Sequence, residues 1–202
     1  MISTRQYQKL FPLILLIGIW FVACSTSYIN VNYRLPSASE SLKSRTVFIE
    51  FKDMRTEKAF LTKAAQKEFK HFTGIFSLKL AGAKKNNLGG HDANSLFKEA
   101  FKKRLNTLGI EVTPARGKNQ PIMEIVLKEF LLDLKGRNWS ISIVFETRLI
   151  KDQDNIATET VSATGERFKS LGRRDAEKVL GEIFSDSLNK IDIQKLFQKV
   201  AL

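Results

Sequence analysis

The sequence predicts an α+β domain in which a mostly antiparallel sheet carries two main helices on one face, as a two-layer structure. Strand-like segments recur along the chain and are joined mainly by short turns, which favours antiparallel pairing. Two other segments have apolar residues at three- and four-residue spacing, the pattern of helices that are buried on one side. A chain of 202 residues with 43% apolar and 27% charged residues can form one such domain plus an extension.

The first strand is predicted over residues 46–53, TVFIEFKD, where β-branched and aromatic residues run up to the turn DMRTEK. Residues 54–74 are compatible with a helix or with a loop that covers a sheet edge, because their apolar residues are only loosely periodic. The segment IFSLKLA at residues 75–81 predicts a second strand.

A helix is predicted over residues 93–108, where the apolar residues form a single stripe. Asp92 or Asn94 is expected to cap its start, and Gly109 provides a left-handed stop. A short strand is expected at residues 110–112.

The rest of the chain predicts a three-strand meander followed by two helices. Residues 122–134 are almost continuously apolar, which is typical of a central strand. The following strand, 139–150, alternates apolar and polar residues, as expected for a strand with one wet face. Residues 157–169 predict a polar edge strand. Apolar stripes predict helices at 173–189 and 191–200.

The chain is strongly basic, with 33 Lys and Arg residues against 21 Asp and Glu residues and a formal net charge of +12. This charge favours an anionic partner, which is a nucleic acid, an anionic lipid surface or an acidic protein. The cellular compartment must decide among these three classes.

Residues 1–23 predict a signal peptide. Arg5 and Lys9 precede an uncharged apolar run at 10–21, which is shorter than the roughly 20 residues that span a bilayer. Small residues then lead to Cys24, the single cysteine of the chain. Together these features resemble a bacterial lipoprotein signal, which implies that Cys24 is acylated and becomes the first residue of the mature protein.

The same resemblance implies a location. In the associated sorting rule, an Asp after the lipidated cysteine favours the inner membrane, but this chain has Ser25. We therefore expect a lipid-anchored protein on the periplasmic face of the outer membrane, where no nucleic acid is available as a partner. Residues 24–45 are expected to form the lipidated cysteine and a flexible tether, and 46–202 the periplasmic domain. Alternatively, the apolar residues Tyr28, Ile29, Val31 and Tyr33 dock this tether on the domain.

The sequence predicts no catalytic centre, metal site or cofactor. His71 and His91 lack metal-ligand spacing relative to each other and to Cys24. No nucleophile elbow, phosphate-binding loop or dinucleotide fingerprint occurs. We therefore expect a protein that is not an enzyme.

Three kinds of candidate binding residues remain. Asp53 and Arg55 are candidates for a binding rim, although a local ion pair that fixes the turn is the simpler interpretation. Gly89 and Gly90 could present backbone amides to an anion, although a flexible loop that ends in an Asp cap is favoured. The basic clusters are either solvated faces or contacts with lipid phosphates; they comprise Lys84, Lys85, Lys102, Lys103, Arg104, Arg173 and Arg174.

Several motifs together resemble the YajG-type lipoproteins, small periplasmic lipoproteins of poorly defined role. They are Cys24 with its signal, DMRT at 53–56, the helix LFKEAFKKRLNTLGIEV, the meander NWSISIVFETRLI and the closing DIQKLFQKV. The outline is also similar to auxiliary lipoproteins of envelope lipid or polysaccharide export machines. Neither family implies catalytic residues.

These observations predict a membrane-anchored, non-enzymatic lipoprotein that binds an envelope protein or supports envelope assembly or transport. The alternative is a carrier or sensor that binds a lipid, a glycan or another small ligand between the sheet and the helices.

Overall fold

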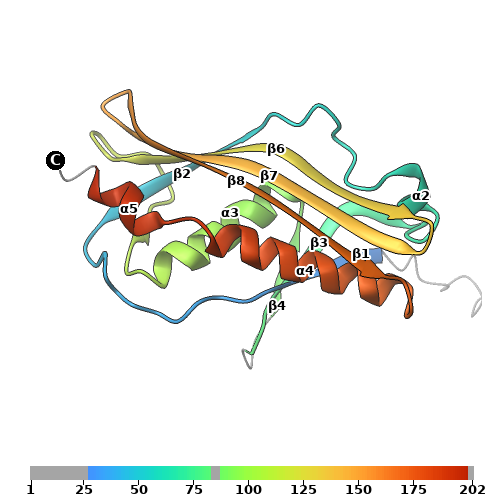
Figure 1. The fold of residues 1–202 in the computed structure, drawn as a ribbon. Coiled ribbons are helices and arrows are strands. Elements are labelled where there is room, and N and C mark those ends of the chain that lie inside the picture. Colours follow the sequence, from blue (N-terminus) through green and yellow to red (C-terminus); the bar gives the residue numbers. More distant parts are fainter. Residues whose placement is uncertain (1–26, 83–86, 200–202) are drawn as a thin grey trace, which may run out of the picture.

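The computed structural model describes residues 27–82 and 87–199. The predicted signal peptide, Cys24, Lys84 and Lys85 lie outside these ranges. Figure 1 shows a long twisted sheet with the two main helices, α3 and α4, on one of its faces. A second, smaller sheet lies on that same side, so the α+β class is confirmed, but the single sheet is not.

The large sheet has the strand order β5-β2-β6-β7-β8. Strands β6, β7 and β8 form the predicted antiparallel meander, and β8 is the predicted edge strand. By contrast, β2 pairs parallel with both β5 and β6, with Phe48 opposite Ile122. The strands are β2 (Thr46–Asp53), β5 (Glu111–Val112), β6 (Ile122–Lys135), β7 (Asn138–Lys151) and β8 (Asp154–Phe168).

The small sheet has the order β1-β3-β4, formed by β1 (Ser27–Tyr33), β3 (Phe72–Leu80) and β4 (Asn87–His91). Strand β1 is parallel to β3, and β4 is antiparallel to β3. The prediction of a mostly antiparallel sheet was therefore only partly correct. The chain leaves the large sheet after β2, builds β3, β4 and α3, and returns to it in the same direction, and a return of this kind produces parallel pairing.

The predicted tether is largely a strand. Ile29, Val31 and Tyr33 are fully buried, and the backbone N–H of Asn30 donates to Glu177 of α4 at 3.0 Å. The docking alternative is therefore confirmed for Ile29, Val31 and Tyr33, whereas Tyr28 is 46% exposed. Strand β1 thus joins the fold ahead of the predicted start at residue 46. The apolar residues at every second position form a strand pattern, which the surrounding Ser and Asn residues obscured.

The two main helices are α3 (Ala93–Asn106) and α4 (Arg173–Asn189), as predicted within a few residues. The predicted stripe of α3 is buried: Leu96, Phe97, Ala100, Phe101 and Leu105. A shorter helix, α5 (Ile193–Gln198), replaces the longer one expected at 191–200. The ambiguous segment 54–74 is mostly loop, with one short helix, α2 (Lys63–Gln66), and a bridge between Leu61 and Leu132 of β6.

Phe97 of α3 lies at the centre of the core. Its ring contacts Phe51 of β2, Phe130 of β6, Phe145 of β7 and Phe184 of α4, with centroid distances of 5.1–6.0 Å. Ring contacts of this kind contribute beyond the buried area itself. One side chain therefore ties both main helices to three strands of the large sheet.

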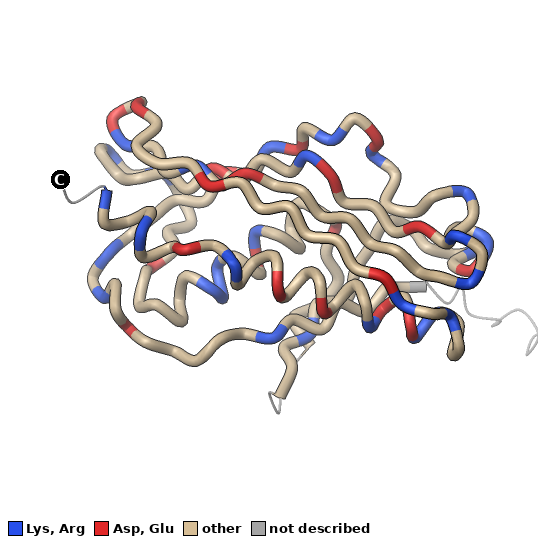
Figure 2. Tube along the Cα trace, in the orientation of Figure 1, with Lys and Arg blue, Asp and Glu red and all other residues tan. Residues whose placement is uncertain are grey.

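The face of the large sheet turned away from the helices carries a chain of ion pairs. Glu124 of β6, whose side chain is 3% exposed, pairs with Lys52 of β2 and with Arg148 of β7. Arg148 also pairs with Glu146, which in turn pairs with Lys128. The hydrogen bonds from Lys128 and Arg148 lower the pKa of Glu146. Figure 2 shows acidic and basic residues along the strands of the large sheet. The two buried acids of this face, Glu124 and Glu146, are both paired.

Candidate functional site

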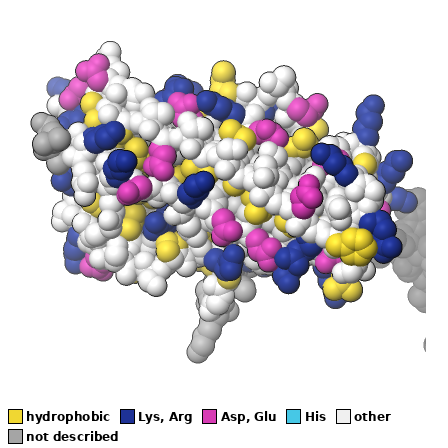
Figure 3. All heavy atoms as spheres, viewed as in Figure 1, with side chains coloured by type: hydrophobic (Ala, Val, Ile, Leu, Met, Phe, Trp, Pro, Cys, Tyr) yellow, Lys and Arg dark blue, Asp and Glu magenta, His cyan; other side chains and the backbone are white. Residues whose placement is uncertain are grey.

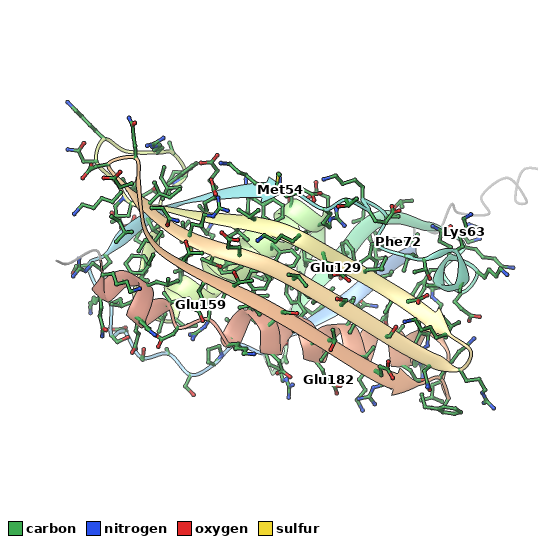
Figure 4. All side chains as sticks on the ribbon, turned by 45° about the horizontal axis from the view of Figure 1, so that its top comes forward. Met54, Lys63, Phe72, Glu129, Glu159 and Glu182 are labelled. Atoms are coloured by element: carbon green, nitrogen blue, oxygen red, sulfur yellow. The ribbon has the colours of Figure 1, made fainter. Side chains whose placement is uncertain are left out.

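A pocket of about 520 Å³ opens between the segment after β2, strand β3 and the first turn of α3. Its volume lies in the range of about 300–1,000 Å³ that is typical of small-ligand sites. The predicted rim residues Asp53 and Arg55 line it, and so do Asp92 and Asn94 at the start of α3. The fold therefore brings together two candidate features that are far apart in the sequence. Phe72, another lining residue, is labelled in Figure 4.

Asp53 and Arg55 form the predicted local ion pair. The Arg55 guanidinium donates from Nε and Nη2 to the two carboxylate oxygens of Asp53, at 3.0 and 2.9 Å, and the Arg55 backbone N–H donates at 3.1 Å. Lys58 adds an ion pair to Asp53 at 3.1 Å. The hydrogen bond from Arg55 holds the pKa of the Asp53 carboxyl well below its usual range. Asp53 is thus ionised and orients Arg55.

Arg55 is buried, so its guanidinium does more than fix the turn through the ion pair with Asp53. The residue is 8% exposed, and its Nη1 has no hydrogen-bond partner within the described ranges. A buried guanidinium normally satisfies its donors, and an unmade bond at such a group costs roughly 1–3 kcal/mol. Arg55 therefore lines the pocket with a guanidinium whose Nη1 is buried and has no partner among the described residues.

The start of α3 does not form the anion site for which the backbone amides of Gly89 and Gly90 were candidates. Gly89 and Gly90 belong to strand β4, and the Asp92 carboxylate caps α3 by accepting the N–H of Ser95 at 2.8 Å. This hydrogen bond lowers the pKa of Asp92. The interpretation as an Asp cap is confirmed, and the helix end offers a carboxylate to the pocket instead of free amides.

The lining of the pocket also contains an aromatic wall, made by Phe60, Phe72 and Phe76, and two lysines. Phe60 lies 4.9 Å from Phe76 and 6.0 Å from Phe72 between ring centroids, and Phe72 lies 5.3 Å from Phe76. Lys58 and Lys70 are exposed lining residues. The site can therefore hold a molecule that joins an apolar body to a carboxylate or phosphate.

The other predicted site residues lie elsewhere. On α3, Lys103 pairs with Glu99 at 3.3 Å, and Lys102 is exposed. Arg104 is half-buried, which lowers its pKa, and its Nη1 donates to Thr107 at 3.4 Å. Arg173 and Arg174 are exposed at the start of α4 and do not line the pocket.

Sequence reasoning missed the aromatic wall and the burial of Arg55. Phe60, Phe69 and Phe72 fall in the segment 54–74, which lacks clear periodicity, and Phe76 falls in the predicted strand 75–81, which gave no sign of a pocket. The available signal was the density of phenylalanine among lysines in this stretch.

In the part of the chain that the structure describes, no three His, Cys, Asp or Glu side chains are placed to hold a metal ion. Within the same residues, no helix combines the length and the apolar character that crossing a membrane requires.

No protein-family model matches the sequence, and a search of curated proteins finds no match. Among solved structures, the chain is similar to a Xanthomonas campestris protein of the DUF330 family, with a TM-score of 0.56 and 10% identity. The match covers 87% of this chain and 98% of that chain. At this identity the comparison establishes a shared fold and nothing about activity.

Looser similarities extend to two other bacterial proteins. Lipoprotein GNA1162 from Neisseria meningitidis has a TM-score of 0.33 and 10% identity, over 72% of this chain and 96% of that chain. A PelC dodecamer from Paraburkholderia phytofirmans has a TM-score of 0.34 and 13% identity, over 74% of this chain and 91% of that chain. Scores this low do not support an argument about this protein. The fold shared with the DUF330 protein is therefore the result that the comparisons establish.

Proposed function

We propose that this chain is a lipid-anchored, non-enzymatic lipoprotein of the bacterial envelope whose domain binds an anionic amphiphile in the Arg55 pocket. The observation that carries the proposal is the Arg55 Nη1 donor, which is buried and unpaired beside an aromatic wall. A ligand carboxylate or phosphate would satisfy this donor, and the apolar part of the ligand would cover Phe60, Phe72 and Phe76.

The pocket favours the carrier or sensor hypothesis over the protein-partner hypothesis. A small ligand needs a concave site that offers both apolar surface and polar groups, and the pocket that Arg55 lines combines phenylalanine side chains with charged residues. Binding without chemistry fits the state of its acids. Asp53 is engaged by Arg55 and Asp92 by Ser95, so neither carboxylate is free to act as a base.

The anchor part of the proposal rests on the pattern before Cys24 and on its resemblance to a lipoprotein signal. Two or three acyl chains hold a protein stably on a membrane, whereas one chain holds it marginally. The periplasmic face of the outer membrane, the absence of nucleic acid as a partner and the YajG-type relationship belong to the same proposal. Radiolabelled palmitate should enter the wild-type chain and not Cys24→Ala, and equal labelling of the two would refute the anchor.

Ligand binding can be tested with two fluorescent probes of similar size. The anionic probe is 8-anilinonaphthalene-1-sulfonate, and the neutral probe is N-phenyl-1-naphthylamine. Because charge-assisted hydrogen bonds contribute about 1.5–3 kcal/mol, Arg55→Gln should weaken the anionic probe by about 10- to 100-fold. The neutral probe should lose little affinity to Arg55→Gln and more to Phe72→Ala.

The control variant is Arg45→Gln, which removes an exposed arginine that does not line the pocket. It should leave the affinity of both probes unchanged. Circular dichroism checks that each variant is folded. The pocket proposal fails if the folded wild-type domain binds neither probe, or if Arg55→Gln and Arg45→Gln have equal effects on the anionic probe.

A protein partner remains a second candidate because β8 has an open edge. In the described part of the chain, this strand of 15 residues pairs with β7 alone. Unpaired strand edges accept an added strand from another protein. A photo-crosslinking residue at Thr160 in intact envelopes should give a discrete adduct that is absent when it replaces Lys118. Identical adducts at both positions would exclude the edge as the contact.

A further inference from the structure

One end of the molecule is strongly basic. The structure assembles it from three segments: 62–71 around α2, the β6–β7 turn at 133–138, and 168–175 between β8 and α4. We call this surface the basic end, and its cations are Lys63, Lys67, Lys70, Lys135, Arg137, Lys169, Arg173 and Arg174. Figure 1 shows α2, this turn and the start of α4 at the right-hand end of the molecule.

Side-chain contacts hold the three segments together. Lys169 pairs with Glu68 at 2.7 Å, and its backbone N–H donates to the Arg137 carbonyl at 2.7 Å. The Arg173 guanidinium lies 4.8 Å from the centre of the Phe69 ring. The basic end is therefore one surface that the fold builds, and not a set of separate loops.

The three segments carry an excess of positive charge. The three segments contain eight Lys and Arg residues and three Asp and Glu residues. All three acids are engaged: Glu68 by Lys169, Asp133 by Thr62, and Asp175 by the backbone N–H of Ser170. Figure 2 shows Lys and Arg gathered at this end. A basic excess of this kind attracts anionic surfaces.

Two large apolar side chains are exposed on the same surface, and the Arg137 guanidinium lies 4.7 Å from the centre of the ring of one of them, Phe168. Phe168 is 54% exposed and Leu171 is 67% exposed, which makes them two of the four exposed large apolar residues in the described ranges. At the right-hand end of Figure 3, apolar side chains lie among dark-blue basic ones. Apolar tips within a basic ring match the boundary between lipid headgroups and acyl chains.

The loop that carries Leu171 is held in place. The backbone N–H of Leu171 donates to the Asp175 carboxylate, and the neighbouring Gly172 carbonyl accepts the indole N–H of Trp139 at 3.0 Å. Leu171 is thus presented outward by a fixed loop, so exposing it is a property of the fold and not of a loose chain end.

The position of the anchor points to the same end. Ser27, the first residue of β1, is paired with Phe72 beside the 62–71 segment. If Cys24 is acylated, as the proposed function holds, three residues can span at most about 10 Å. The anchor would then keep the start of β1, and with it the basic end, close to the bilayer surface.

We propose that the basic end docks on an anionic phospholipid surface, with its cations on lipid phosphates and with Phe168 and Leu171 inserted at the headgroup boundary. This orientation rests on the proposed lipoprotein function, because the lipid anchor is what brings the domain to a membrane. The docking surface itself stands on the charge and exposure of the described residues, and it can be tested without acylation.

The test uses a chain from Ser25 onward, which contains every residue of the buried core. An N-terminal polyhistidine tag holds it on vesicles through a nickel-chelating lipid, so Cys24 plays no part. A fluorophore is attached at Leu171→Cys, and lipids with brominated acyl chains act as the quencher. We expect quenching on vesicles of phosphatidylcholine and phosphatidylglycerol and little quenching on phosphatidylcholine alone.

The position control is a label at Asp154→Cys, at the other end of β8, about 45 Å away along the strand. It should stay unquenched on both kinds of vesicle. Replacing Lys63, Lys67 and Lys70 by Gln should reduce the ratio of docked to undocked protein by about 100-fold, or about fivefold per charge. The matched variant replaces the exposed Lys190, Lys195 and Lys199, which lie outside the basic end.

Docking by the basic end is supported if quenching occurs at position 171, is absent at 154 and is lost in the first triple variant. It is refuted if the label at 171 stays unquenched on anionic vesicles, or if the two triple variants lose quenching equally. Failure of the palmitate experiment alone would remove the anchor and leave this result intact, so the two failures are distinguishable.

Discussion

Replacing Ile29 by alanine tests whether β1 is part of the folded domain, on which the position of the anchor depends. Ile29 is fully buried in the sheet that β1 forms with β3. The substitution removes three buried carbons, each worth about 0.8 kcal/mol on transfer, or about 2.4 kcal/mol in total. The cavity left in a packed core adds to this cost, and measured values for such substitutions are about 2–5 kcal/mol.

Urea unfolding of the chain from Ser25 onward, followed by circular dichroism, measures this loss. A domain of this size should also lose about 2–4 °C of melting temperature per kcal/mol, or about 4–20 °C for a loss of about 2–5 kcal/mol. The control is Tyr28→Ala at the adjacent residue, which is 46% exposed and should cost less than about 1 kcal/mol. Equal stability of Ile29→Ala and wild type would mean that 27–33 is a free tether, and the reasoning about β1 would be wrong.

Three further predictions concern the core, the ion pairs and acid stability. Phe97→Ala should destabilise the domain by about 3–5 kcal/mol in urea unfolding, because its fully buried ring joins two helices to three strands; a loss below about 1 kcal/mol would contradict its central place. Arg148→Met should lower the unfolding free energy by about 3 kcal/mol, because it leaves the buried Glu124 carboxylate with one of its two cations. Adding Glu124→Gln should recover most of this loss. If the costs of the two substitutions simply add, the two charges are independent. The pKa of Asp53 in the fold is below its unfolded value of about 3.9, so its pairing with Arg55 stabilises the fold above that pH and less as the pH falls below it. The difference in unfolding free energy between wild type and Arg55→Gln should therefore shrink from about pH 5 to pH 2. A difference that stays constant would exclude the pairing with Asp53 as the source of that stability.

The elements that could be predicted are those whose pattern is complete within one segment. The stripe of α3, its Asp92 cap and the alternating strand β7 each carry their signal locally, and the structure confirms them. The parallel pairing of β2 with β6 could not be predicted in this way, because it depends on the path of the 68 residues between them and not on either strand's own sequence. Strand β1 was obscured for a related reason, since its partners β3 and α4 are distant in the chain.

The candidate site shows the same division. The Asp53–Arg55 pair was visible because both residues belong to one turn, and the geometry confirms the local ion pair. The burial of Arg55 was not visible, because it depends on how the segments that line the pocket are assembled. A buried donor becomes evident only when the surrounding elements are assembled, so sequence alone suggested a turn where the fold forms a pocket.

The sequence pattern of the segment between β2 and β3 could not be interpreted because the segment contributes to two different surfaces. Phe60 and Phe69 are buried, and Phe60 lies on the sheet against Phe130. Lys63 and Lys67 point to solvent at the basic end, whereas Lys70 borders the pocket as well. A helix or strand that serves one face has one period, but this segment serves a pocket and an outer surface in turn. The order of apolar and basic residues therefore reflects which of the two surfaces each residue faces. This is why the segment shows no regular period.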